Sequence, residues 1–398
     1  MIALLAPGQG SQTEGMLSPW LQLPGAADQI AAWSKAADLD LARLGTTAST
    51  EEITDTAVAQ PLIVAATLLA HQELARRCVL AGKDVIVAGH SVGEIAAYAI
   101  AGVIAADDAV ALAATRGAEM AKACATEPTG MSAVLGGDET EVLSRLEQLD
   151  LVPANRNAAG QIVAAGRLTA LEKLAEDPPA KARVRALGVA GAFHTEFMAP
   201  ALDGFAAAAA NIATADPTAT LLSNRDGKPV TSAAAAMDTL VSQLTQPVRW
   251  DLCTATLREH TVTAIVEFPP RARLAVSPNA NFGGSGTRRQ VTRRPGRAGK
   301  PITADSARTT TYPSVRFVHN ILRREACCAC HSGRNHCRYR RDHRRGNRYR
   351  AVRDHPGEVV RRRPGHRLAV DGRDRRADRG QVRRQDPRRG PRRSAYRR

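Results

Sequence analysis

Short apolar runs alternate with longer segments of helical period over most of the N-terminal part of the chain. The runs at residues 2–5, 84–88 and 264–268 are rich in branched side chains and are followed by glycine or proline. Residues 56–77 and 94–101 place apolar side chains at helical spacing, so buried strands alternate with helices. This order is typical of an α/β protein with a largely parallel sheet.

The pattern changes between residues 127 and 189, where the predicted elements are shorter. We predict strands at 131–137, 151–157, 161–166 and 183–189, and helices at 139–149 and 168–176. The order βαββαβ is the ferredoxin-like arrangement. We therefore predict a large α/β domain at residues 1–126 and 190–270, with a small ferredoxin-like subdomain inserted at residues 127–189.

Charge divides the chain near Pro270. The 398 residues carry a net charge of +16, yet residues 271–398 hold 37 Lys and Arg against 9 Asp and Glu, and residues 1–270 hold 18 against 30. The basic tail lacks a sustained hydrophobic period, so we expect it to be disordered. No run approaches the roughly 18 apolar residues of a membrane span, and the N-terminus lacks the basic region of a signal peptide. We expect a cytoplasmic protein without membrane contact.

Three interpretations of the tail compete. A nucleic-acid-binding tail mixes Lys with Arg and interleaves aromatic residues, whereas this tail has 36 Arg and one Lys, so we expect no specific nucleic-acid partner. A zinc site matches structural sites poorly, because its cysteines are partly adjacent and no spaced second half follows; its candidate ligands are Cys327, Cys328, Cys330, His331, His336 and Cys337. We favour translation of GC-rich DNA in a shifted frame, which enriches Arg and makes Lys rare.

A candidate nucleophile lies in Gly89-His90-Ser91-Val92-Gly93, which matches the G-x-S-x-G nucleophile elbow. The pentapeptide is weak evidence alone, but it follows a predicted strand and precedes a predicted helix, as the elbow requires. The alternative is a glycine-rich turn with a bystander serine.

A serine hydroxyl needs a general base, and the acidic body offers four histidines. His90 is adjacent to the serine on a tight turn and is expected to support the loop. His71 and His260 fall within or near helices, where surface or capping roles suit them. His194, in the loop that returns to the large domain, is the best candidate for the base.

Six spaced motifs together resemble the malonyl-CoA:acyl carrier protein transacylases of fatty-acid synthesis, and the resemblance covers residues 1–270. They are Gly8-Gln9-Gly10-Ser11-Gln12, Gly89-His90-Ser91-Val92-Gly93-Glu94, Arg116-Gly117-x-x-Met120, Asn155-x-Asn157, Ala192-Phe193-His194 and Gln243-Leu244-x-x-Pro247-Val248-x-Trp250. Two positions depart from the family pattern: Ala121 stands where Gln is usual, and Ala158-Ala159 where x-Pro is usual.

The resemblance implies a covalent route through a seryl ester. Ser91 is the expected nucleophile and His194 the base, oriented by a main-chain carbonyl at Gln243 instead of a carboxylate. The main-chain N–H groups of Val92 and Gln9 are expected to form the oxyanion hole. No metal and no cofactor are expected, since malonyl-CoA is a substrate.

The resemblance also implies a substrate-binding set. Arg116 would bind the malonyl carboxylate with paired hydrogen bonds; the alternative is a surface arginine paired with Glu119 or Asp107. Phe193 is expected to narrow the acyl pocket against branched groups, and Asn155 is assigned to substrate binding.

The fold implied is an α/β-hydrolase-like large domain with an inserted ferredoxin-like subdomain and the active site between them. The expected partner is acyl carrier protein, and we expect a monomer. Alternatives are an acyl hydrolase or a polyketide-type acyltransferase with the same Ser/His site and, outside enzymes, a nucleic-acid-binding protein acting through the tail. The body cysteines Cys78, Cys124 and Cys253 are expected to be reduced core residues.

Overall fold

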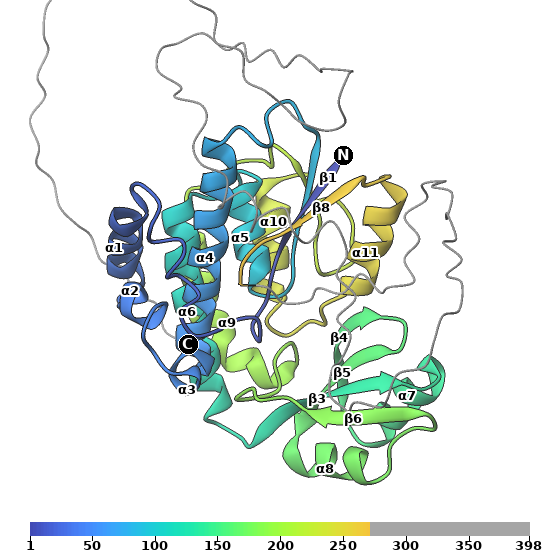
Figure 1. Cartoon of the computed structure of the whole chain (residues 1–398). Helices are drawn as coiled ribbons and strands as arrows, with labels where there is room; N and C mark the ends of the chain where they lie inside the picture. The colour runs from blue at the N-terminus through green and yellow to red at the C-terminus, as the bar shows by residue number, and fades with distance from the viewer. Residues whose placement is uncertain (271–398) are drawn as a thin grey trace, which may run out of the picture. The chain divides into compact units, whose positions relative to one another are not determined.

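Four parallel strands form the sheet of the large domain, one of two four-stranded sheets in the described residues (Figure 1). A computed structural model describes residues 1–270, and the predictions for residues 271–398 lie outside the described residues. The strands stand in the order β7 (Thr220–Leu221), β2 (Val85–Gly89), β1 (Ile2–Ala6) and β8 (Ala264–Glu267). The three apolar runs of the sequence are therefore neighbouring strands, and the predicted parallel sheet is confirmed.

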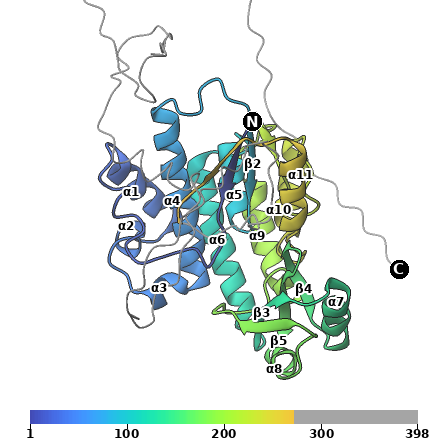
Figure 2. The same ribbon diagram turned by 45° about the vertical axis from the view of Figure 1, so that its right-hand side comes forward.

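Both faces of this sheet are covered, which explains why its strands are apolar throughout. Leu4 and Ala6 belong to the main core, whereas Ala3 and Leu5 face a second cluster on the other side, as the two-residue period of a strand requires. The second cluster is closed by α11 (Trp250–Glu259). Figures 1 and 2 show α11 on one side of the sheet and the larger group of helices on the other.

The main core is built by helices of both halves of the chain. They are α4 (Thr56–Arg76), α5 (Gly93–Ile100), α6 (Ala106–Cys124), η1 (Glu196–Ala201), α9 (Leu202–Ala210) and α10 (Ala233–Ser242). Alanine and small polar residues let α4 and α6 pack closely: a Cβ on Gly117 would lie 2.6 Å from the Thr56 carbonyl oxygen. The helices that bear Arg116 and Gln60 are thereby held side by side.

The sheet of the small subdomain is antiparallel, in the order β4 (Val152–Ala158), β5 (Gln161–Arg167), β3 (Thr129–Gly136) and β6 (Ala182–Ala186). Helices α7 (Glu139–Gln148) and α8 (Leu168–Glu176) pack on it through Val142, Leu146, Leu171 and Leu174. This is the predicted ferredoxin-like arrangement, and all its elements lie between residues 127 and 189. The strand order follows from the βαββαβ connectivity.

Main-chain pairing joins the antiparallel sheet to the segment that precedes α11. Val248, just before α11, donates its N–H to the Ala154 carbonyl and accepts from the N–H of Arg156, both at 2.9 Å. The segment around Val248 belongs to the large domain and pairs with the outer edge of β4. The contact fixes the antiparallel sheet against the start of α11.

Three helices between β1 and α4 were not predicted: α1 (Ala26–Ala37), α2 (Leu41–Leu44) and α3 (Thr50–Thr54). Trp33 of α1 is fully buried and donates its indole N–H to Asp107 at 2.7 Å. The prediction that all three body cysteines lie in the core holds for Cys253, which is buried. It is wrong for Cys78, which is exposed beyond the end of α4, and Cys124 is only half-buried; all three are free thiols. Within residues 1–270 no helix combines the length and apolarity needed to cross a bilayer.

Candidate active site

Ser91 lies on the turn between β2 and α5, with a backbone φ of 53°. A turn this sharp needs glycine on both sides. A Cβ on Gly89 would lie 2.1 Å from the main chain of Gly93, and a Cβ on Gly93 would lie 2.4 Å from the carbonyl oxygen of Ala6. The pattern Gly-x-Ser-x-Gly therefore follows from the close approach of three main-chain segments.

His194 lies directly against the serine. Its Nε2 is 2.7 Å from Ser91 Oγ, and its Nδ1 is 2.8 Å from the main-chain oxygen of Gln243. Because that carbonyl can only accept, Nδ1 carries the proton and Nε2 is left to accept the serine hydroxyl. Burial, and secondly the nearby charge of Arg116, lower the pKa of His194 to about 3. The imidazole is therefore neutral and competent as a base at neutral pH.

The predicted oxyanion-hole donors are the main-chain N–H groups of Val92 and Gln9. Neither the N–H of Val92 nor that of Gln9 has a hydrogen-bond acceptor among residues 1–270, although Val92 is fully buried. Val92 immediately precedes α5, so its N–H lies at the positive end of the helix. Gln9 lies in the loop after β1, where its side-chain amide donates to Thr56 Oγ1 at 3.3 Å. Unpaired main-chain donors of this kind can bind an oxyanion.

Arg116 projects from α6 into the core and is 1% exposed. Its Nη1 donates to Gln60 Oε1 at 2.7 Å and its Nη2 to Gln243 Oε1 at 2.8 Å, while its Nε has no partner in the described structure. The alternative of a surface ion pair is wrong, because Glu119 pairs with Lys122 and Asp107 with Trp33. Burial lowers the pKa of Arg116 to about 10, which leaves it cationic at neutral pH.

The other two predicted substrate-binding residues are placed less directly. Phe193 is 6% exposed, belongs to the main core and immediately precedes His194. Asn155 is 8% exposed; its main chain pairs with Val248, and its side-chain oxygen has no partner in the described residues. Asn155 makes no hydrogen bond to Ser91, His194 or Arg116.

Sequence reasoning missed a buried polar group behind the serine. Glu94 Oε1 accepts the main-chain N–H of Asn224 at 2.6 Å, and its Oε2 accepts Gln243 Nε2 at 2.5 Å. Asn224 Oδ1 in turn accepts the N–H of Ser91 at 2.8 Å. Burial raises the pKa of Glu94 to about 8. Glu94 was visible in the elbow motif. Gln60 stands out only as a polar residue between apolar ones, and nothing in the sequence around Asn224 marks it.

The remaining histidines have structural contacts. His90 Nε2 is 3.0 Å from Asn157 Oδ1, and its ring packs edge-on against Trp250. His260 caps the end of α11, as expected. His71 is not a surface residue: burial lowers its pKa, and its ring packs against Phe268.

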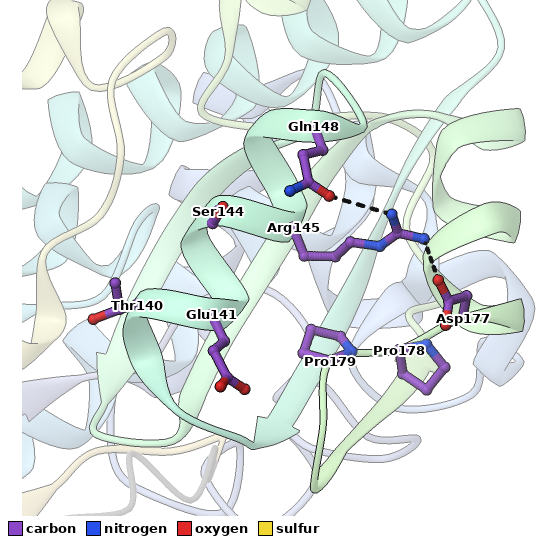
Figure 3. A pocket seen from close by; sticks show the side chains of 8 residues that line it. All are labelled: Thr140, Glu141, Ser144, Arg145, Gln148, Asp177, Pro178 and Pro179. Atoms are coloured by element: carbon purple, nitrogen blue, oxygen red, sulfur yellow. Dashed lines mark hydrogen bonds and ion pairs between the residues drawn. The ribbon is translucent and has the colours of Figure 1, made fainter.

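A cavity of about 550 Å³ lies in the small subdomain, between α7 and the loop that precedes β6 (Figure 3). Arg145 lies on its wall and pairs with Asp177 at 2.7 Å. None of the predicted site residues lines it. It is separate from the Ser91 and His194 pair.

Comparisons with known proteins identify the family. The model of the acyl transferase domain matches residues 4–282. The malonyl CoA-acyl carrier protein transacylase of Mycobacterium tuberculosis H37Rv is 98% identical over 275 residues, which are 69% of this chain and 91% of that protein. The chain belongs to the acyl transferase family. The enzyme of the same name from Escherichia coli K12 is 34% identical over 62% of this chain and 82% of its own length.

Solved structures agree with the family assignment. The crystal structure titled MCAT from Mycobacterium tuberculosis superposes with a TM-score of 0.68 at 99% identity, over 69% of this chain and 91% of that one. A type II PKS acyl-carrier protein in complex with its malonyl-transacylase gives a TM-score of 0.63 at 30% identity, over 67% and 88%. The predicted fold is thereby confirmed. The family match runs 12 residues past Pro270.

Proposed function

We propose that this chain is a malonyl-CoA:acyl carrier protein transacylase that acts in fatty-acid biosynthesis. It moves malonyl from coenzyme A to the phosphopantetheine thiol of acyl carrier protein. The identity of 98% to the mycobacterial enzyme supports the assignment. The observation that carries it is the buried Arg116 guanidinium, which shares Gln243 with the base of the Ser91 and His194 pair.

In the first half-reaction Ser91 Oγ attacks the thioester carbonyl carbon while its proton passes to His194 Nε2. The C–S bond then breaks, and the same nitrogen returns the proton to the departing coenzyme A sulfur. The second half reverses these roles: His194 takes the proton of the carrier thiol, the sulfur attacks the seryl ester, and Ser91 regains its hydroxyl. The 2.7 Å contact supports direct transfer without an intervening water.

Each half-reaction passes through a tetrahedral oxyanion. The unpaired N–H groups of Val92 and Gln9 are the donors we assign to it. Both are main-chain groups, one at the start of α5 and one in the loop after β1, so no side chain has to be oriented when charge develops. Loss of one such donor costs about 2.7–4 kcal/mol in the barrier.

The malonyl carboxylate is assigned to Arg116. Its Nε and its uncommitted Nη hydrogens remain available, and a guanidinium binds a carboxylate through parallel charge-assisted bonds. Burial strengthens this pairing, because little solvent competes. We assign Phe193 to limiting the width of the acyl pocket and Asn155 to substrate binding.

The chemistry needs no metal or cofactor, since base, oxyanion donors and cation all come from the chain. The natural location is the cytoplasm, which suits the three free thiols of residues 1–270. Acyl carrier protein is the partner.

Intact-mass measurement after incubation with malonyl-CoA tests the function. We expect one malonyl adduct that disappears in Ser91→Ala and persists in Ser144→Ala, an exposed serine on α7. Added holo acyl carrier protein should then take the malonyl group. Release of malonate to water in place of transfer would identify a hydrolase, and preference for a polyketide-type carrier would identify the other acyltransferase class.

A further inference from the structure

Asn224 holds the main chain of the nucleophile turn at two points. Its side-chain Nδ2 donates to the carbonyl oxygen of Gly89 at 2.7 Å, and its Oδ1 accepts the N–H of Ser91 at 2.8 Å. One amide thus closes a bridge across the residue between them. Asn224 is 1% exposed and lies 133 positions from the serine in the sequence, so this contact depends on the folded domain.

The turn needs such a bridge because its conformation is unfavourable. Ser91 has a φ of 53°, and a non-glycine residue in the left-handed region costs on the order of 1–3 kcal/mol, so it persists only when its surroundings determine it. The Asn224 side chain forms hydrogen bonds with two main-chain groups of the turn, the N–H of Ser91 and the carbonyl oxygen of Gly89. Without it, Ser91 N–H would be buried without an acceptor.

Asn224 is itself fixed by Glu94. The Glu94 carboxyl accepts the Asn224 N–H at 2.6 Å and Gln243 Nε2 at 2.5 Å, and the same Nε2 is 3.2 Å from Asn224 Oδ1. Gln243 then reaches the other two functional groups. Its main-chain oxygen accepts His194 Nδ1–H, and its side-chain oxygen accepts Arg116 Nη2–H.

We propose that Asn224 is a positioning residue that clamps the nucleophile turn, and that Glu94 couples this clamp to the base and the cation through Gln243. The inference deepens the proposed transacylase function and rests on it. Asn224 touches no reacting atom. It acts by keeping Ser91 Oγ within reach of His194 Nε2, where a displacement of about 1 Å can slow a reaction about 100-fold.

The test distinguishes a lower rate constant in correctly folded molecules from a smaller fraction of folded molecules. Rapid-quench acylation by malonyl-CoA, followed by intact mass, gives both the fraction of molecules that react and the rate constant of those that do. We expect Asn224→Ala to keep the reactive fraction, to lower the rate constant by about 10- to 100-fold, and to leave the half-saturating concentration within about threefold. The matched control is Asn211→Ala, because Asn211 also donates to a main-chain oxygen, at 2.9 Å, but is exposed at the end of α9.

Asn224→Asp is the second variant and decides the matter if the alanine variant does not fold. It keeps the size of the side chain and the oxygen that faces Ser91 N–H but loses the donor to Gly89. We expect it to be slowed as well. A wild-type rate constant in either folded variant, or a loss confined to the reactive fraction, would overturn the clamp.

A parallel reaction with a fluorophosphonate distinguishes the clamp from the proposed substrate. Ser91 Oγ attacks phosphorus, fluoride leaves, and His194 accepts the serine proton, so no malonyl recognition is involved. If wild type reacts with this probe but not with malonyl-CoA, the proposed function fails, while a slower reaction of Asn224→Ala with the probe still supports the clamp. Equal rates of reaction with the fluorophosphonate in wild type and Asn224→Ala would contradict the proposed clamp.

Discussion

The side-chain oxygen of Gln243 accepts a hydrogen bond from Arg116, and the main-chain oxygen of the same residue accepts one from His194. A single residue at the end of α10 therefore orients both the base and the cation. The distance between the reacting carbonyl and the bound carboxylate is short in a malonyl group, so the two recognition elements need a common support. Gln243 supplies it, and its position depends on the fold of residues far apart in the sequence.

Arg116→Ala should separate malonyl transfer from acyl transfer in general. We expect acylation of Ser91 by malonyl-CoA to fall by at least about 100-fold, because a buried bidentate charge pair is lost. Acylation by acetyl-CoA, which has no carboxylate, should be changed much less. Arg43→Ala, in an exposed ion pair with Glu52, serves as the control. An equal loss with both thioesters would assign Arg116 a structural role only.

The rate of Ser91 acylation should not fall near pH 6.5, where protonation of an ordinary histidine would inactivate the base. Because burial lowers the pKa of His194 from 6.5 to about 3, the imidazole stays neutral as the pH falls through 6 and 5. We expect the rate constant for Ser91 acylation to remain nearly constant between pH 7 and pH 5. Rapid-quench measurements over this range check it. A midpoint near 6.5 would show that His194 has an ordinary pKa in the folded protein.

Glu94 should make the folded state less stable as the pH rises. Its pKa is about 8 in the folded chain and near 4.5 when unfolded, so between these values the folded state binds the additional proton. The free energy of unfolding should therefore decrease from pH 5 to pH 8, and Glu94→Gln should flatten this decrease. Denaturant titrations of both proteins at the two pH values measure it. Parallel curves for wild type and variant would contradict the raised pKa.

Substitution of an elbow glycine by alanine should destabilise the protein far more than the same substitution at an open glycine. Gly89→Ala places a Cβ 2.1 Å from the main chain of Gly93, and we expect it to lower the free energy of unfolding by about 3 kcal/mol or more. Gly188→Ala is the control, since a Cβ there meets nothing within 4 Å. Thermal and denaturant unfolding of the two variants make the comparison. Similar losses in both would argue against close packing at the elbow.

The coding DNA should contain a family-like C-terminus in another frame. The mycobacterial relative matches this chain over 91% of its own length, and the basic tail follows where that match ends. Reading the DNA one base over from about codon 270 should therefore yield the missing family sequence. Resequencing the region and translating all frames checks this. If no frame resembles the family, the shifted-frame hypothesis fails.

Much of the fold was predictable because its signals are local. The strand at residues 84–88 and the helices at 139–149 and 168–176 lie within one residue of their observed bounds, since apolar period and turn residues act over short distances. The helices between residues 26 and 54 were missed. Two of them, α2 and α3, are short, and α1 is held by tertiary contacts such as that of Trp33 with Asp107.

The candidate site was predictable where a motif marks it. Ser91 and Val92 lie in the elbow, and His194 and Gln243 follow from the family resemblance. The residues behind them were not found, because a buried amide such as Asn224 is recognisable only from what it contacts. Nothing in one sequence indicates that residues 89, 94, 224 and 243 meet.

The pairing of Val248 with Ala154 and Arg156 uses peptide groups alone. Such pairing does not depend on the side chains at these positions, so most substitutions there would leave the hydrogen bonds in place. Proline is the exception, because it has no N–H to contribute. Proline at position 156 or 248 would remove one of these two hydrogen bonds. The orientation of the antiparallel sheet relative to the large domain would then depend more on side-chain packing.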